Sequence, residues 1–345
     1  MKNAVLEVRN LTAAYGENSV LNDVSFCLST GETACLLGPS GCGKTTVLRC
    51  IAGFETPRSG EVWLRGNMVA DPNAQVPPEK RGVGMVFQET ALFPHLTVVD
   101  NVAFGLHGKS AAEKQQIACF LLELVSLEKY ADRYPDQLSG GEQHRVALAR
   151  AMAPKPDLIL LDEPFANLDA GLKERLGREV RDILRERGIA ALLVTHDQHE
   201  AFAFADRIGV MNEGRVVQFA TPFDVYHRPA GRFVAGFVGE GVMLRATLRN
   251  GTLETALGSV QDGRLGDIEA GEFDLLVRPD DVVADPSARC LARVRDKAFR
   301  GAETLYTLEL EDGSRVLSLL PSHQDFAIGE EIRIRLEADH LITFR

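Results

Sequence analysis

The sequence lacks several features that define common classes of protein. No apolar run approaches the roughly 18 residues that a membrane-spanning helix requires, and short runs such as Leu158–Leu161 are flanked by charge or proline. Glu7 and Arg9 interrupt the N-terminal apolar residues before a signal-peptide core can form. The six cysteines include no Cys-x-x-Cys pair, which argues against a disulfide framework and against a structural zinc site. We therefore expect a cytoplasmic protein with free thiols that does not itself span a bilayer.

Positive charge is also in deficit. The chain has 38 Lys and Arg against 49 Asp and Glu, a net charge of −11, which is the wrong sign for a protein that binds nucleic acid through phosphate contacts. Residues 236–345 alone carry 13 basic and 20 acidic residues. We expect no nucleic-acid partner, and we interpret this last third as a compositionally separate unit.

The length of 345 residues predicts about two domains. Residues 1–235 alternate short apolar runs, at 33–37, 158–161 and 190–194, with helical stretches. This alternation is typical of an α/β domain whose buried, mainly parallel sheet is covered by helices. The pattern from about 89 to 155 is nearly all helical and predicts a helical subdomain inserted between strands.

A different pattern begins near residue 242. Strand-like runs at 243–248 and 304–310 precede Asn250-Gly251 and Asp312-Gly313, and a third run covers 331–336. Asn-Gly and Asp-Gly between apolar runs are hairpin signals. We predict a small all-β domain over 242–345, consistent with a barrel, after a glycine-rich linker at 236–241.

One segment matches the phosphate-binding loop pattern G-x-x-x-x-G-K-[ST]. It reads Gly38-Pro39-Ser40-Gly41-Cys42-Gly43-Lys44-Thr45, followed by Thr46 in the predicted helix. Its glycines let backbone N–H groups turn toward phosphate, Lys44 adds a point charge, and Thr45 offers an oxygen to Mg²⁺. The alternative is a glycine-rich turn with a chance lysine, which the strand-to-helix setting disfavours.

Two further strand ends carry polar groups that suit phosphate chemistry. The run 158–161 ends in Asp162 and Glu163, and ligands of such sheets gather beyond the strand carboxyl ends. We expect Asp162 to hold Mg²⁺ and Glu163 to polarise the attacking water. The run 192–195 ends in His196, whose imidazole can hydrogen-bond the γ-phosphate or that water. Taken alone, these would be solvated acids and a structural histidine, and His199 has no comparable support.

A Ser-Gly-Gly turn at Ser139, Gly140 and Gly141 precedes another predicted helix. Exposed N–H groups, a hydroxyl and a helix dipole make it an anion site of the same physical kind. Judged alone, an ordinary helix N-cap is the preferred interpretation.

Together these segments resemble the ATP-binding subunits of ABC transporters, whose phosphate loop, signature sequence, acidic strand and switch histidine occur in this order. The resemblance covers essentially the whole chain. It implies that Tyr15 stacks on adenine, that Gln88 senses Mg²⁺ and the γ-phosphate, and that residues 167–169 cross to a partner. It also implies that Ser139 and Gly141 act on the ATP of a second copy, so that two ATP molecules are clamped in a homodimer.

Two positions depart from the family pattern. Glu142 stands where glutamine is more usual, and Ala166 stands where serine is frequent. We expect the charge of Glu142 to weaken closure on phosphate slightly.

A single ATP-binding unit with a β-rich tail resembles the importers that serve periplasmic or surface solute-binding proteins. Their tail is a regulatory, oligonucleotide-binding-like domain of the TOBE type, and their ATPase lies peripherally on the cytoplasmic face of the inner membrane against permease subunits. Residues 49–55, 88–98 and 237–241 look most like the ferric iron branch. Polyamine, sulfate, maltose or phosphonate are alternative cargoes. A soluble ABC ATPase acting on ribosomes or DNA, and a P-loop kinase or GTPase, are the rival functions.

Overall fold

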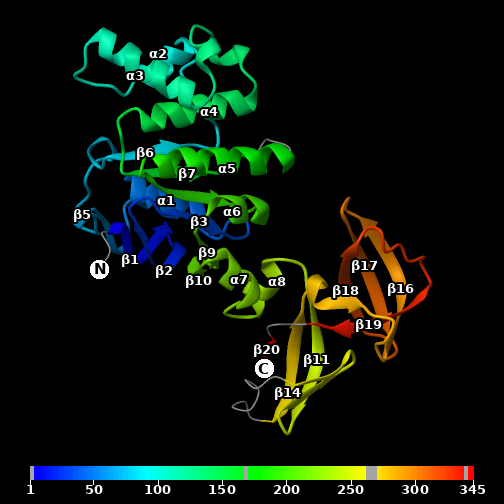
Figure 1. Cartoon of the computed structure of the whole chain (residues 1–345). Helices are drawn as coiled ribbons and strands as arrows, with labels where there is room; N and C mark the ends of the chain where they lie inside the picture. Colours follow the sequence, from blue (N-terminus) through cyan, green and yellow to red (C-terminus); the bar gives the residue numbers. More distant parts are fainter. Residues whose placement is uncertain (1–3, 167–169, 262–269, 338–340) are drawn as a thin grey trace. The chain divides into compact units, whose positions relative to one another are not determined.

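The computed structural model describes residues 4–166, 170–261, 270–337 and 341–345 (Figure 1). The segment 167–169, expected to cross to a partner, lies outside the described residues. The chain divides into two compact units, Met1–Pro222 and Phe223–Arg345, called here the N-terminal and the C-terminal unit. Within the described ranges, no helix has both the length and the apolar character needed to cross a membrane.

The N-terminal unit is built around a six-stranded sheet whose inner pairings are all parallel. Its order is β10 (Arg215–Ala220), β9 (Arg207–Asn212), β3 (Thr33–Leu37), β8 (Ala190–Thr195), β7 (Leu158–Asp162) and β6 (Val83–Val86). Only β10 joins antiparallel. Every residue of β3, β7 and β8 is buried, as expected for strands covered on both faces. The predicted α/β class is confirmed.

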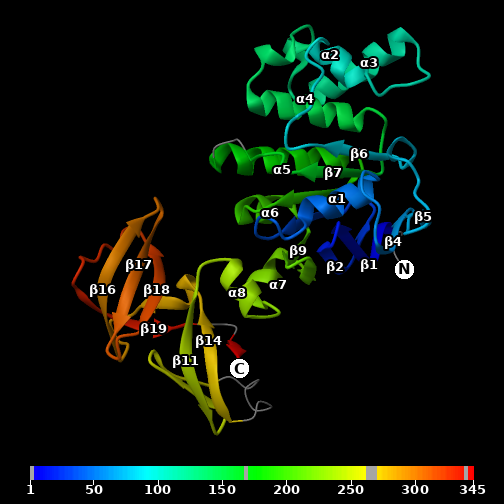
Figure 2. The same ribbon diagram turned by 180° about the vertical axis from the view of Figure 1, so that it is seen from behind.

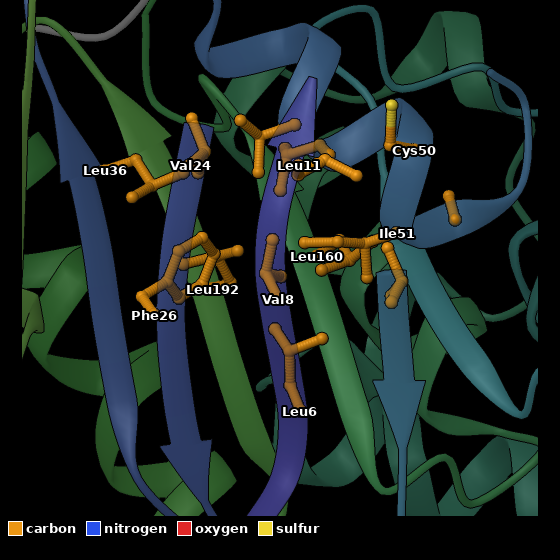
Figure 3. Packing of buried hydrophobic residues seen from close by; sticks show 14 of the residues in the cluster. Leu6, Val8, Leu11, Val24, Phe26, Leu36, Cys50, Ile51, Leu160 and Leu192 are labelled. Atoms are coloured by element: carbon orange, nitrogen blue, oxygen red, sulfur yellow. The ribbon is translucent and has the colours of Figure 1, made fainter. Parts of the chain in front are cut away.

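A second sheet in this unit was not anticipated from the sequence. It is antiparallel, in the order β2 (Asn18–Ser29), β1 (Ala4–Tyr15), β4 (Ser59–Leu64) and β5 (Asn67–Ala70). Figure 3 shows Val8 and Phe26 of this sheet packed with Leu160 and Leu192 of the parallel sheet and with Ile51 of α1 (Lys44–Ala52). The main core of the unit therefore lies between the two sheets and buries α1.

Helices fill the remaining layers of the N-terminal unit. α5 (Ala170–Glu186) and α6 (Gln198–Phe204) each connect strands of the parallel sheet. α2 (Val98–Ala103), α3 (Ala111–Leu124) and α4 (Gly140–Met152) form a helical lobe on the side of β6 away from β1 and β2, visible from both directions in Figures 1 and 2. Short 3-10 turns occur at Pro78–Lys80, Glu128–Tyr130 and Pro135–Gln137.

The C-terminal unit is mainly antiparallel β structure around one core. One sheet has the order β13 (Gly258–Gln261), β12 (Thr252–Thr255), β11 (Val242–Arg249), β14 (Gly271–Val277) and β20 (Ile342–Phe344). The other has the order β15 (Val282–Ala284), β19 (Glu331–Leu336), β16 (Cys290–Phe299), β17 (Glu303–Leu310) and β18 (Arg315–Pro321). The turns predicted at Asn250-Gly251 and Asp312-Gly313 connect β11 to β12 and β17 to β18.

The segment expected to be a linker is packed into the C-terminal unit. Helices α7 (Pro222–His227) and α8 (Arg232–Phe237) precede it, and the buried Arg278 guanidinium donates to the carbonyl oxygens of Ala235, Glu240 and Tyr226. A Cβ on Gly239 would lie 2.4 Å from Cε2 of Tyr226. Glycine is needed here for close packing, and the boundary between the two units lies after Pro222, the first residue of α7, rather than at 236–241.

Candidate functional site

The phosphate loop joins the end of β3 to the start of α1. Gly43 is the N-cap of α1 and has φ 105°, a conformation that glycine adopts without strain. A Cβ at this position would also meet Cδ2 of Leu21 at 2.6 Å. The sequence therefore needs glycine here for the loop to turn sharply into the helix.

Lys44 is held inside the loop. The residue is 5% exposed, and its ammonium donates to the carbonyl oxygens of Gly38 at 2.7 Å and Pro39 at 2.9 Å. Both partners are neutral, so the positive charge is not neutralised by either of them. A buried ammonium whose carbonyl partners are neutral favours the arrival of an anion.

The carboxyl end of β7 meets the loop through one hydrogen bond. Thr45 Oγ1 donates to Asp162 Oδ1 at 3.0 Å. Burial raises the pKa of Asp162 and the charge of Glu163 adds to this, while the Thr45 hydrogen bond acts in the opposite direction. The pairing places two hard oxygen atoms together beside the buried Lys44.

Glu163 and His196 come together at the ends of neighbouring strands. Glu163 has φ 45°, and its N–H donates to Val194 O at 2.9 Å, so the backbone at the end of β7 is fixed to β8. Its Oε2 lies 3.3 Å from Nδ1 of His196. The left-handed backbone costs on the order of 1 kcal/mol for a residue that is not glycine, which is strain of the kind found at functional sites.

A pocket of about 260 Å³ opens beside these groups. Six of its lining residues belong to the phosphate loop or follow it, the seventh is Glu163, and the eighth is Val20, which the sequence reasoning missed. The lining from the loop is Ser40, Gly41, Gly43, Lys44, Thr45 and Thr46. No motif marks Val20, because its place depends on how β2 packs against the loop.

Other residues predicted for the site do not line this pocket. Tyr15 lies 45% exposed at the end of β1, and Gln88 lies exposed two residues after β6. Ser139, Gly140 and Gly141 begin α4 in the helical lobe. Among the described residues, the pocket is thus formed by the phosphate loop, Val20 and Glu163.

The start of α4 is already occupied by a carboxylate of its own chain. The backbone N–H and the hydroxyl of Ser139 both donate to Oε2 of Glu142 at 2.8 Å. These hydrogen bonds lower the pKa of Glu142. Glu142, which stands where the family more usually has glutamine, therefore caps the start of α4.

A polar cluster next to His196, with two members buried and two half-buried, was also missed. It consists of Lys173 in α5, Thr195 at the end of β8, and Asp197 and Glu200 at the start of α6. The sequence gives one weak signal, since an Asp followed three residues later by Glu marks a helix start. Nothing in the sequence connects that start to Lys173.

Comparison with known proteins places this geometry in a family. Residues 21–166 match the model described as "ABC transporter", and residues 275–344 match the model of the "TOBE domain". A Haemophilus influenzae protein named Fe(3+) ions import ATP-binding protein is 39% identical over 345 residues, covering 97% of each chain. The chain belongs to the import ATP-binding proteins of ABC transporters.

Two further relatives of this importer ATPase are informative. A sulfate/thiosulfate import ATP-binding protein of Chromobacterium violaceum is 41% identical, covering 98% of this chain and 95% of its own. The ATP-binding cassette MJ0796, solved as a dimer in a post-hydrolysis state with ADP and phosphate, is 32% identical, with a TM-score of 0.56 over 63% of this chain and 98% of its own. Like other members of the family, the importer ATPase binds ATP, couples its hydrolysis to transport, and works with membrane permease components.

Proposed function

We propose that this importer ATPase hydrolyses ATP at the pocket beside Lys44, with Mg²⁺ as the resident metal. The observation that carries the proposal is one pocket lined by the buried Lys44, by Thr45 and by Glu163. Asp162 adjoins the pocket through its hydrogen bond with Thr45, and His196 through its 3.3 Å contact with Glu163. The β- and γ-phosphates are bound by the N–H groups of the loop and the start of α1. The Lys44 ammonium then exchanges its two carbonyl partners for phosphate oxygens.

The Thr45 hydroxyl and the Asp162 carboxylate fit a hard cation, since Mg²⁺ prefers oxygen ligands. When bound, the metal neutralises charge that develops on the phosphate oxygens. Glu163 is the general base that takes the proton of the attacking water, and His196 orients its carboxylate from 3.3 Å. Gln88 joins the site when nucleotide and metal are bound, and Tyr15 stacks on adenine.

A second copy completes the site. Ser139, Gly140 and Gly141 do not line the pocket of their own chain, and phosphoryl transfer requires donors around the whole γ-phosphate. We infer that the start of α4 of one copy closes the pocket of the other, so that two ATP molecules lie in a homodimer.

The cargo proposed is ferric iron, by the names of relatives such as the Haemophilus influenzae protein. Sulfate is the second candidate, because the Chromobacterium violaceum relative matches at 41% identity. The ATPase then lies peripherally on the cytoplasmic face of the inner membrane, against permease subunits that receive cargo from a periplasmic or surface binding protein. The TOBE domain is regulatory in this proposal.

The test of the ATP site is Glu163→Gln, which keeps the size of the side chain and removes the base. The variant is expected to bind ATP normally, to hydrolyse it at least about a hundredfold more slowly, and to accumulate as an ATP-bound dimer in light scattering. Glu79→Gln, an exposed acid in the same unit, is the matched control. Normal turnover by Glu163→Gln would refute the assignment of the base.

The test of the cargo is uptake by cells in which the native protein is replaced by Lys44→Ala. Labelled ferric iron, sulfate, maltose and polyamine are supplied separately. Loss of iron uptake alone is the expected result. Loss of sulfate uptake instead would retain the importer and replace its cargo, and no loss at all would favour a soluble ABC ATPase.

A further inference from the structure

Four polar side chains contact one another in and around the turn that carries His196. The Lys173 ammonium is 3.1 Å from Oε1 of Glu200 and 3.4 Å from Oδ2 of Asp197. Thr195 Oγ1 donates to the other Glu200 oxygen, Oε2, at 2.5 Å. The Glu200 carboxylate is thus held on both sides, at Oε1 by the ion pair with Lys173 of α5 and at Oε2 by the hydrogen bond from Thr195 of β8.

These contacts fix the turn on both sides of His196. The Thr195 hydroxyl also accepts the backbone N–H of Asp197 at 3.0 Å, which closes the turn over the histidine. Asp197 caps α6 by accepting the N–H of His199 at 2.9 Å. His196 itself directs Nδ1 toward Glu163 at 3.3 Å. The position of the imidazole is therefore set by its two neighbours and, through Glu200, by Lys173.

Burying these charges is costly. Glu200 is 3% exposed, and the side chain of Lys173 is 15% exposed. Apolar side chains of similar volume at such sites are often as stable or more stable, so stability alone gives no reason for an ion pair here. Burial lowers the pKa of Lys173, but the close contact with Glu200 and the charges of Glu200 and Asp197 outweigh it, and the net shift is upward. The ammonium therefore stays charged beside both carboxylates.

We propose that Lys173 and Glu200 are positioning residues for ATP hydrolysis, which hold His196 in register with Glu163 by fixing the turn 195–197 against α5. This inference rests on the proposed roles of Glu163 and His196. It adds two residues outside the nucleotide pocket to the machinery of the reaction. It also makes α5 the support on which the orientation of the base depends.

The experiment uses the full-length protein and measures kcat, KM and ATP affinity. Lys173→Met is expected to lower kcat ten- to hundredfold, since a small misplacement of a catalytic group has effects of this size, and to change ATP affinity less than about twofold. Lys173→Arg is expected to restore most of the activity, because it keeps a cation at the same place. Arg181→Met is the matched control: it removes a basic side chain from the same helix, with its 2.9 Å hydrogen bond to Ala203 O of α6, but does not touch the turn.

A double-mutant cycle separates positioning from a merely structural role. In a His196→Ala background, Lys173→Met is expected to have no further effect on kcat, because it acts through the histidine. An equal loss of kcat in both backgrounds would overturn the proposal, as would an unchanged kcat in Lys173→Met or an equal loss in Arg181→Met. The NMR signals of the His196 imidazole are expected to move in Lys173→Met and not in Arg181→Met.

Two provisions keep the test decisive. If Lys173→Met does not fold, Thr195→Val takes its place, because it removes the hydroxyl between Glu200 and Asp197 at nearly constant volume, and the same outcomes apply. If Lys44→Ala hydrolyses ATP as fast as the native chain, the proposed function itself is wrong. If Lys44→Ala is inactive but the Lys173 variants hydrolyse ATP normally, only the positioning role of Lys173 and Glu200 is wrong.

Discussion

Two helices of the N-terminal unit, α1 and α4, begin at glycine-rich turns, and the two starts differ in how they hold negative charge. α1 follows Gly43, and across the described part of the unit no side chain caps it and its first turn holds no acid. α4 follows Ser139, whose N–H and hydroxyl are taken by Glu142 three residues later. The first start is open to an anion, whereas the second has one of its own.

The difference shows that a glycine-rich helix start does not define an anion site by itself. At α1 the helix dipole and the buried Lys44 act together, so both favour a phosphate. At α4 the Glu142 carboxylate already satisfies the dipole, and a phosphate must compete with it for the Ser139 hydroxyl. We expect α1 to provide most of the affinity for ATP and α4 to contribute only after closure.

The largest expected effect concerns the start of α1, which is open to an anion. Lys44→Ala removes the only side-chain charge within the phosphate loop, and we expect ATP binding to be lost and hydrolysis to fall at least about a hundredfold. Equilibrium dialysis with ATP and phosphate-release assays measure both. Lys109→Ala, at an exposed lysine in the loop before α3, is the control and is expected to behave as the native protein. Near-native binding by Lys44→Ala would remove the basis of the comparison.

The next effect concerns the hydrogen-bonded oxygen atoms of Thr45 and Asp162 beside the start of α1. Asp162→Asn keeps the hydrogen bond with Thr45 but removes the carboxylate charge, so we expect Mg²⁺-dependent hydrolysis to fall about a hundredfold at most while ATP still binds. Titration of activity with Mg²⁺ measures the change. Asp157→Asn, just before the other end of β7 and paired with Arg65 at 2.7 Å, is the matched control. Equal losses in both variants would mean that the strand, rather than the carboxylate, is what matters.

The sequence predicts the buried strands of the parallel sheet and the glycine-rich start of α1, because both depend on local patterns. The buried runs at 33–37, 158–161 and 190–194 became β3, β7 and β8, since a strand covered on both faces is apolar throughout. The role of Glu142 was less accessible. Its charge was noted, but its capping of Ser139 depends on side-chain rotamers that the sequence does not specify.

Contacts between distant segments could not be predicted in the same way. Lys173 meets Glu200 only because α5 and α6 pack together, and no spacing rule links two helices separated by a strand. The glycines at 236–241 indicated a linker, yet Gly239 packs against Tyr226 and the segment is fixed by Arg278. Composition distinguishes loops from helices, but it does not distinguish a free loop from a packed one.

A smaller effect concerns the start of α4, where Glu142 caps the helix. Glu142→Gln removes a negative charge that competes with phosphate for Ser139, so we expect ATP to promote dimerisation and turnover at about two- to fivefold lower concentration. Light scattering and the KM for ATP measure the change. Glu113→Gln is a close control, because Glu113 makes the same capping interaction with Ser110 at the start of α3. A rise in KM for Glu142→Gln would show that the carboxylate assists closure.

The smallest expected effect is the pH dependence of the α4 cap. Hydrogen bonds from Ser139 lower the pKa of Glu142 below its ordinary value of 4.5, so the carboxylate stabilises the folded state above that pH. This contribution is lost as pH falls through the lowered pKa of the folded state. Because the carboxylate is partly exposed, we expect Glu142→Gln to cost only about 0.5 kcal/mol at pH 7.

The single tryptophan makes this measurable, since Trp63 lies in β4 of the same unit. Urea unfolding followed by its fluorescence is expected to show the native chain more stable than Glu142→Gln at pH 7, with the difference shrinking below about pH 4.5. At the uncapped start of α1 the first turn offers no carboxylate to titrate, so the acid-sensitive difference belongs to α4. If the difference in unfolding free energy between the two chains grew toward acid pH, the ionised Glu142 carboxylate would destabilise the folded state, and α4 would have no favourable cap.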